Sequence, residues 1–181
     1  MNPKSISRRN FIKMSAIGAG CLYIAGCAGS PVSYHYILTP WEAEIVDALA
    51  DQIIPPDEYA GGREAGVTNY IDKQLSGFFN EQAPMYKACL KALDETCKEV
   101  YGKEFTALDF DTQTEYLEDI QGGKYNSADW YGYTASSFFG TLRGHCMQGF
   151  YGSPRHGGNK NFVSYRMMKL DYPYLVGRNV H

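Results

Sequence analysis

Five segments of this chain place apolar residues at every third or fourth position, which puts those side chains on one face of an α-helix. No segment of strand length alternates cleanly between apolar and polar residues, as a half-buried strand would require. We therefore predict an all-α fold, a small irregular bundle of about five helices. An ordered C-terminal loop and tail, rich in Gly, Pro and Asn, is expected from Tyr151 onward.

Local signals predict where these helices begin and end. Thr39, Pro40 and Glu42 form the pattern of a capping box, and the pair Pro55-Pro56 should end this first helix. The later helices are expected over residues 67–79, 83–101, 109–121 and 133–150, with Gly102 ending the third helix of the series. The side chains expected to face the core are Trp41, Ile45, Leu49, Ile53, Val67, Tyr70, Ile71, Leu75, Phe78, Met85, Cys89, Leu93, Cys97, Val100, Phe110, Leu117, Ile120, Phe138, Leu142, Cys146 and Phe150.

Residues 1–27 have the pattern of a bacterial export signal. Arg8 and Arg9 are followed by Phe11, an aliphatic residue and a lysine, which matches the twin-arginine pattern. The apolar region that follows is too short to span a hydrocarbon core of ~30 Å, but it suits a signal peptide. We expect this segment to direct export of an already folded protein, with an amphipathic N-terminal helix as the alternative.

The end of this segment, Ile24-Ala25-Gly26-Cys27, resembles a lipobox, in which the cysteine thiol receives a diacylglyceryl group. Several acyl chains would anchor the protein stably, so we expect it on the periplasmic side of the envelope. Simple cleavage and an uncleaved anchor are the alternatives. Ala28 stands where inner-membrane lipoproteins usually have Asp, which leaves inner and outer membrane open. Residues 28–38 are expected to form a tether and residues 39–181 a single helical domain.

The charge distribution argues against nucleic acid as a partner. The chain has a formal net charge of −3, but its basic N-terminal segment hides an acidic remainder. Residues 27–181 contain 13 basic and 20 acidic residues, a net charge of −7. A nucleic-acid-binding domain would instead show a basic face. The 15 tyrosines fit either a surface that meets a partner or a core completed by amphipathic rings.

The cysteines offer a disulfide but no metal motif. Cys89 and Cys97 lie on one expected helix, roughly 12 Å apart along its axis, which is too far for a disulfide. Either could pair with Cys146, or all three could be core residues. The sequence shows no haem, iron–sulfur, zinc or dinucleotide-binding motif, so we expect no cofactor in this chain.

The histidines are weak catalytic candidates. His145 precedes Cys146 directly, and neighbouring positions on a helix do not face each other. An independent enzyme that uses His145 or His156 is therefore the less favoured hypothesis. Twin-arginine export suits proteins that fold around a cofactor or travel with a folded partner. Because no cofactor motif is visible, the sequence favours a small helical subunit that accompanies such a partner.

The C-terminal part of the chain resembles a known family. The stretch runs Phe139-x-x-Leu142-Arg143-x-His145-x-x-x-Gly149-Phe150-Tyr151-Gly152-Ser153-Pro154-x-x-Gly157-Gly158-Asn159. It is similar to subunit 3, the small subunit, of membrane-bound flavoprotein dehydrogenases of the gluconate 2-dehydrogenase type. Shorter similarities occur upstream, at residues 51–55, 67–72 and 101–108. The Trp and the Gly-x-Pro turn of the family are replaced here by Tyr165 and Asp171-Tyr172-Pro173.

This resemblance implies a non-catalytic subunit of an oxidoreductase complex that acts on CH–OH groups of sugars or sugar acids. It implies FAD in a large subunit, which this chain would escort through export and tether at the membrane, and haem c in a third, cytochrome subunit. Docking of the large subunit is expected at Phe150, Tyr151, Pro154, Gly157, Gly158 and Asn159, with packing on the chain's own helices as the alternative. The alternative function is a stand-alone envelope lipoprotein that binds sugar or another envelope component.

Overall fold

The computed structural model describes residues 36–126 and 128–170. The predicted export signal, with Arg8, Arg9 and Phe11, and the predicted lipidation site Cys27 lie outside these residues. The described part of the chain contains helices and turns and no strand, which confirms the all-α prediction. None of its helices is both long enough and apolar enough to cross a membrane.

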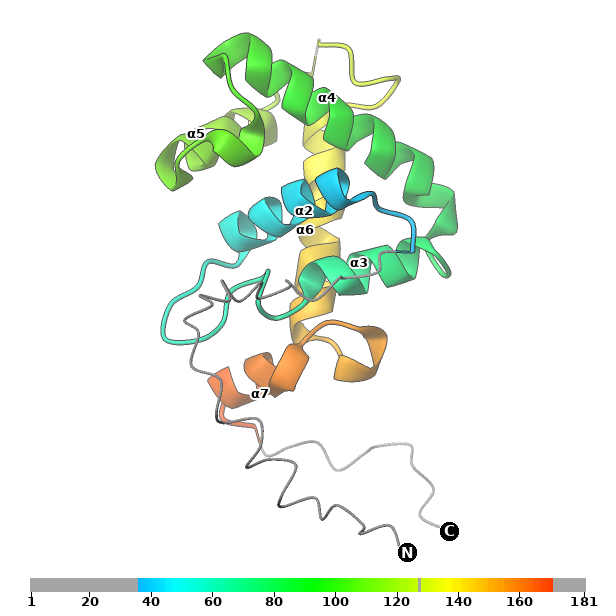
Figure 1. Cartoon of the computed structure of the whole chain (residues 1–181), viewed down its shortest axis with the longest axis vertical. Coiled ribbons are helices and arrows are strands. Elements are labelled where there is room, and N and C mark those ends of the chain that lie inside the picture. Colours follow the sequence, from blue (N-terminus) through cyan, green and yellow to red (C-terminus); the bar gives the residue numbers. More distant parts are fainter. Residues whose placement is uncertain (1–35, 127, 171–181) are drawn as a thin grey trace, which may run out of the picture. The chain divides into compact units, whose positions relative to one another are not determined.

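Figure 1 shows the helices of the described residues in chain order. They are α2 (Pro40–Ile53), α3 (Val67–Leu75), α4 (Ala83–Tyr101), α5 (Phe110–Gln121), α6 (Ala135–Tyr151) and α7 (Val163–Met167). Short 3-10 turns lie between them: η1 (Asn80–Gln82), η2 (Phe105–Ala107), η3 (Pro154–His156) and η4 (Lys160–Phe162). Helix α4 has the predicted bounds, whereas α7 and the turns η3 and η4 lie in the segment predicted to be a loop and tail. Helix α3 ends at Leu75 rather than at residue 79, because the chain turns back there and the Phe79 N–H donates to the Gln74 carbonyl at 2.8 Å.

Local hydrogen bonds confirm several of the predicted helix ends. The Thr39 hydroxyl accepts from the Glu42 N–H at 3.2 Å, and the Glu42 carboxylate accepts from the Thr39 N–H at 2.7 Å, so the capping box is confirmed. Helix α4 ends at Gly102, whose φ of +70° lies in the left-handed region that favours glycine. Asp109 and Thr134 cap α5 and α6 with their side chains.

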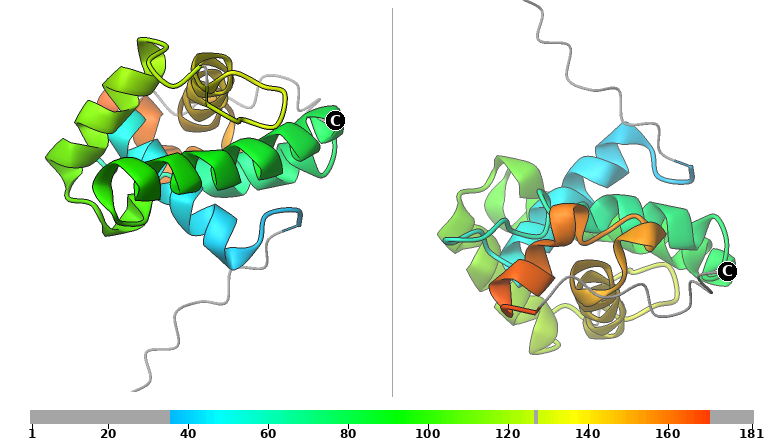
Figure 2. Two further views of the ribbon diagram at one scale, coloured as in Figure 1. Left: turned by 90° about the horizontal axis from the view of Figure 1, so that it is seen from above. Right: turned by 90° about the horizontal axis from the view of Figure 1, so that it is seen from below.

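Helix α6 forms the centre of the core. It packs against α2, α3, α4, α5 and α7. Figure 2 views α6 nearly along its axis, with α2 and α4 to one side of it. Its predicted inward residues, Phe138, Leu142, Cys146 and Phe150, are all buried. The sequence therefore predicted correctly which face of α6 enters the core.

Some predicted core positions at the ends of the other helices are exposed. Trp41, Val100 and Phe110 are all partly open to solvent, and Phe78 is 84% exposed. Their apolar stripes continue in sequence beyond the point where a neighbouring helix covers them. Phe78 also lies after the end of α3, so the helical spacing that predicted its direction does not apply to it.

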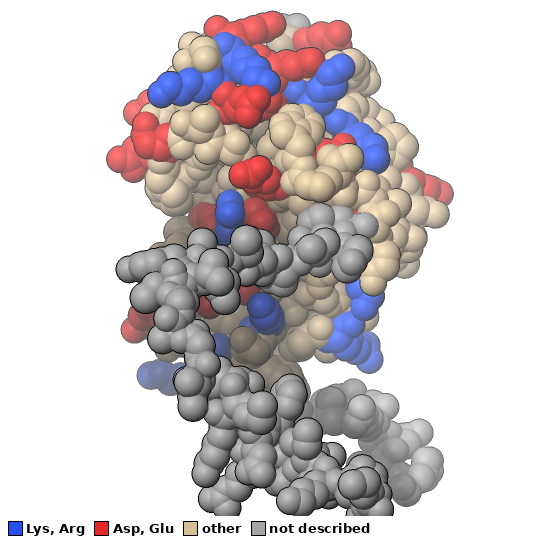
Figure 3. All heavy atoms as spheres, viewed as in Figure 1, with Lys and Arg blue, Asp and Glu red and all other residues tan. Residues whose placement is uncertain are grey.

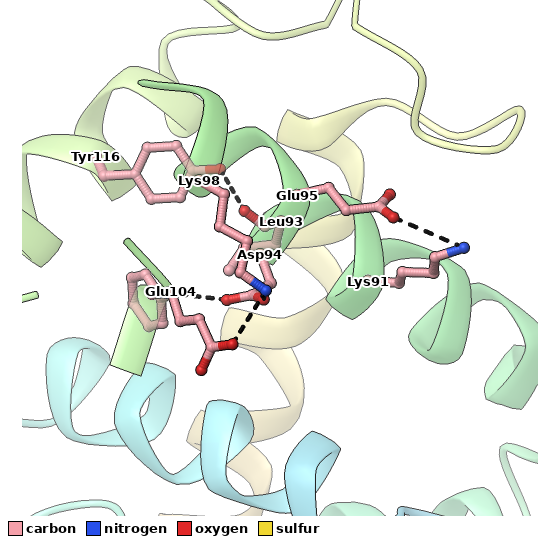
Figure 4. A network of polar contacts seen from close by, with 8 residues as sticks. Lys91, Leu93, Asp94, Glu95, Lys98, Glu104 and Tyr116 are labelled. Atoms are coloured by element: carbon pink, nitrogen blue, oxygen red, sulfur yellow. Dashed lines mark hydrogen bonds and ion pairs between the residues drawn. The ribbon is translucent and has the colours of Figure 1, made fainter. Parts of the chain in front are cut away.

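A polar network joins α4 to the turn η2 and to α5 (Figure 4). The buried Asp94 carboxylate accepts from the Phe105 N–H at 2.9 Å, and it also forms an ion pair with Lys98 at 2.9 Å. Lys98 reaches Glu104 at 3.1 Å. The buried Tyr116 hydroxyl donates to the Leu93 carbonyl at 2.8 Å, which ties α5 to α4. Burial without a partner would cost the Asp94 carboxylate and the Tyr116 hydroxyl ~1–3 kcal/mol each, so these two hydrogen-bonded groups fix this corner of the fold.

Asp72 of α3 holds the segment that leads into α2. Its carboxylate accepts from the N–H groups of Ile37 at 2.8 Å and Leu38 at 2.7 Å, and also from that of Tyr36. Asp72 is 1% exposed, so these hydrogen bonds are shielded from water. The start of the described chain is therefore bound to α3 before α2 begins.

Candidate partner-binding surface

The Gly-Gly-Asn segment, predicted as a docking loop, packs closely on the chain's own helices. Gly157 has a φ of +106°, and its carbonyl accepts from the Asn69 side chain of α3 at 2.7 Å. A Cβ at Gly158 would collide with the Gly149 carbonyl of α6, so only glycine fits this contact. The fully buried Asn159 donates to the Gly152 carbonyl at 2.8 Å and accepts from the Ser164 N–H at 3.0 Å.

The predicted docking residues therefore divide into two groups. Phe150, Gly158 and Asn159 are buried in the fold. Tyr151 is exposed, and Pro154 and Gly157 are half-buried. The buried group serves the packing of α6 on the loop, which was the alternative interpretation for this stretch. Docking through the accessible group, Tyr151 above all, stays a prediction.

Two hollows lie beside α6 on the side of α2. We call the first the α7 hollow, which has a volume of about 300 Å³. Its walls include Ile53, Ile54, Tyr59, Met147, Tyr151 and Met167. The α7 hollow therefore lies between α7 and the C-terminal ends of α2 and α6, and its lining is mostly apolar. Pockets of this size and lining are large enough to take one or two side chains of a partner.

We call the second the α5 hollow, which has a volume of about 220 Å³. Its walls include Gln52, Ile53, Thr114, Leu117, Phe139 and Arg143, so Ile53 borders both hollows. Gln52 is held in place, because its amide donates to the Gln113 side chain at 3.0 Å and accepts from the Thr114 hydroxyl at 2.8 Å. The Arg143 side chain, in contrast, has no ion pair or hydrogen bond to any described residue.

The three cysteines of the described chain are buried free thiols. Cys89 and Cys97 lie on α4 and Cys146 on α6. Burial raises the pKa of each thiol to about 12. They are therefore protonated at neutral pH, and a protonated thiol is neither a nucleophile nor a metal ligand.

His145 is part of the core between α4 and α6. Its Nδ1 lies 2.7 Å from the buried Tyr86 hydroxyl in a hydrogen bond, and its ring stacks on Phe79 with centroids 4.4 Å apart. Burial lowers the pKa of His145, so the imidazole is neutral at neutral pH. His156 is exposed and accepts from the Arg155 guanidinium at 3.0 Å. Within the described residues, no cluster of three His, Cys, Asp or Glu side chains could hold a metal ion.

Comparison with known families gives one match. The model of the family described as Gluconate 2-dehydrogenase subunit 3 matches residues 40–171. These residues run from the first turn of α2 to just beyond the described chain, so the match includes both hollows and α6. It confirms the family predicted from the stretch Phe139–Asn159. No match to the chain was found among curated proteins or among solved structures.

Proposed function

Because this chain belongs to the gluconate 2-dehydrogenase subunit 3 family, we propose that it escorts and tethers a folded dehydrogenase subunit. Membership of the family makes the chain a small subunit of a dehydrogenase complex. The finer proposal is that the large subunit contains FAD, oxidises a CH–OH group of a sugar or sugar acid, and crosses the inner membrane bound to this chain. A cytochrome subunit with haem c would accept the electrons.

The separation between the N-terminal segment and the matched helical domain supports the escort proposal. The family match begins at Pro40, so it excludes residues 1–39, which contain the twin-arginine pattern at Arg8 and Arg9 and the lipobox cysteine Cys27. In this proposal, export and anchoring depend on these N-terminal residues, which lie outside the helical domain. The helical domain is then available for binding the partner, and the twin-arginine route allows the pair to cross while folded.

The chemistry of the helical domain fits a binding role. Its three thiols are protonated, and its buried histidine is bonded to Tyr86 and stacked on Phe79. Its accessible features include the two hollows and the residues beside them. This arrangement supports a division of labour in which the large subunit supplies the redox group and this chain supplies the contact surface.

The proposal predicts that export of the large subunit depends on this chain. The partner to use is the large FAD-binding protein expected in the neighbouring reading frame, without a signal peptide of its own. It should appear in the periplasmic and membrane fractions when expressed with the full chain, and stay in the cytoplasm when expressed alone. The double variant Arg8→Lys and Arg9→Lys should also leave it in the cytoplasm.

A second variant separates export from tethering. Cys27→Ala should leave export intact and move the complex from the membrane to the soluble periplasmic fraction, because the acyl anchor is lost. Equal export of the large subunit with and without this chain would disprove the escort proposal.

A further inference from the structure

Helix α6 has a buried apolar face and an opposite face with a single charged residue. One face enters the core through Phe138, Leu142, Cys146 and Phe150. On the opposite face, residues follow one another at spacings of three and four, and we call this set the α6 outer face: Gly140, Arg143, Gly144, Met147 and Tyr151. Arg143 is the one residue among Lys, Arg, Asp and Glu in the whole helix. Ser136, Ser137 and Gln148 lie beside this set, so the outer face is a narrow stripe on which the exposed Met147 and Tyr151 are candidate contacts for another chain.

Two glycines of the outer face have no role within the described fold. A Cβ added at Gly140 or at Gly144 would meet no atom of another part of the chain within 4 Å. Gly149 on the same helix differs, because a Cβ there would come within 3.0 Å of the Tyr70 ring. Glycine weakens a helix interior, so glycines that their own chain does not require indicate that another backbone approaches closely.

The remaining outer-face side chains are of the types that are enriched in protein interfaces. Met147 and Tyr151 are partly exposed, and both also line the apolar α7 hollow. Arg143 borders the α5 hollow, which Glu118 also lines, but the Arg143 side chain forms no ion pair within the described chain. Tyr, Met and Arg are enriched at interfaces, and an unpaired guanidinium is suited to pair with a carboxylate of the partner.

The outer surface of α4 provides the contrast. Lys91 forms an ion pair with Glu95 at 3.7 Å, and Lys98 pairs with Asp94 and Glu104. The solvent-exposed surface of α4 therefore contains ion pairs. On the face shown in Figure 3, acidic and basic side chains intermingle over α4 and α5.

We propose that the α6 outer face binds an apolar segment of the large dehydrogenase subunit, whose backbone comes close at Gly140 and Gly144 and whose carboxylate pairs with Arg143. This inference rests on the proposed function and specifies the surface that performs it. Apolar side chains of the same segment enter the α7 and α5 hollows, which lie along the flank of the outer face. The predicted docking residue Tyr151 belongs to this surface, whereas the buried Phe150 and Asn159 do not.

Met147 and Val100 give a matched pair of variants for the test. Both are apolar, 42% and 47% exposed, and close to the C-terminal end of their helices, but Val100 lies on α4 and lines neither hollow. The full chain is expressed with the FAD-containing large subunit, and the large subunit that is recovered with it after export is measured. Met147→Lys should reduce the recovery ~10-fold or more, as loss of an interface hot spot does. Val100→Lys should leave it at the wild-type level.

Photo-crosslinking then identifies what covers the face. A photoreactive phenylalanine derivative in place of Met147 should cross-link to the large subunit, and the same residue in place of Val100 should not. A cross-link from position 147 to a second copy of this chain or to its own residues 171–181 would overturn the inference, as would full recovery with Met147→Lys. In those cases wild-type export of the large subunit still supports the proposed function, whereas failure of wild-type export refutes the proposed function itself.

Discussion

Replacing Gly140 and Gly144 by alanine should stabilise the isolated chain and weaken its complex. Both positions lie in the interior of α6, where each glycine destabilises the helix by ~1 kcal/mol relative to alanine. The added methyl groups meet no atom of another part of the fold within 4 Å, so no steric cost is expected. The double variant Gly140→Ala/Gly144→Ala should therefore raise the free energy of unfolding by ~2 kcal/mol.

Urea denaturation of the purified full chain, followed by far-UV circular dichroism, measures this change. The urea midpoint should rise while the slope of the transition stays constant, because the area exposed on unfolding barely changes. In a thermal scan the same gain corresponds to an increase of roughly 4–8 °C in Tm. The large subunit recovered with the double variant should fall, because two methyl groups would separate the two backbones. A more stable chain that binds less well cannot be explained by misfolding.

Gly149→Ala is the control on the same helix. Its Cβ would come within 3.0 Å of the Tyr70 ring, so this variant should lose ~1–3 kcal/mol of stability through overpacking. A lower urea midpoint for the Gly140/Gly144 double variant would refute the reasoning, because the chain itself would then fill the space beside these glycines. An unchanged recovery of the large subunit would refute the close approach of its backbone.

Two further predictions concern buried polar groups. Asp72→Asn removes the negative charge of this side chain and leaves one acceptor oxygen for the N–H groups of residues 36–38. The variant should therefore lose ~1–3 kcal/mol of stability and exchange its amide hydrogens faster at Ile37 and Leu38. Unchanged exchange at both residues would contradict the role of Asp72. Burial lowers the pKa of His145, so below pH ~6.5 the unfolded chain binds the proton first, and stability should fall as the pH decreases towards the folded-state pKa. Urea midpoints between pH 7.5 and 5.5 should therefore fall more steeply for the wild type than for His145→Gln, and equal slopes would contradict this assignment.

The helices could largely be predicted from the sequence because their signals are local. The capping box at Thr39 and Glu42 and the left-handed glycine at Gly102 depend on hydrogen bonds and torsion angles within a few residues. The inward face of α6 was equally clear, because a spacing of four repeats along its whole length. In α4 and α5 the apolar spacing continues past the covering helices, and there the prediction of burial was wrong, as at Val100 and Phe110.

The candidate site could be predicted only in part. The stretch from Phe139 to Asn159 was identified from its residues, but its sequence does not say which members serve the fold and which face outward. Asn159 became an internal bridge because Gly152 and Ser164 lie next to it in the folded chain. Gly140 and Gly149 look alike in sequence, yet only Gly149 has an aromatic ring packed against it.

The sequence by itself determined the helical class, most helix ends and the family of this protein, because periodicity, caps and motifs act over short distances along the chain. The tertiary structure decided which apolar residues are left over for a partner. That outcome depends on how α2, α3, α4, α5 and α7 surround α6, and contacts between residues far apart in the chain leave no local trace. The outer face of α6, with its open glycines and its unpaired Arg143, is left between the hollows only once those helices have packed around α6.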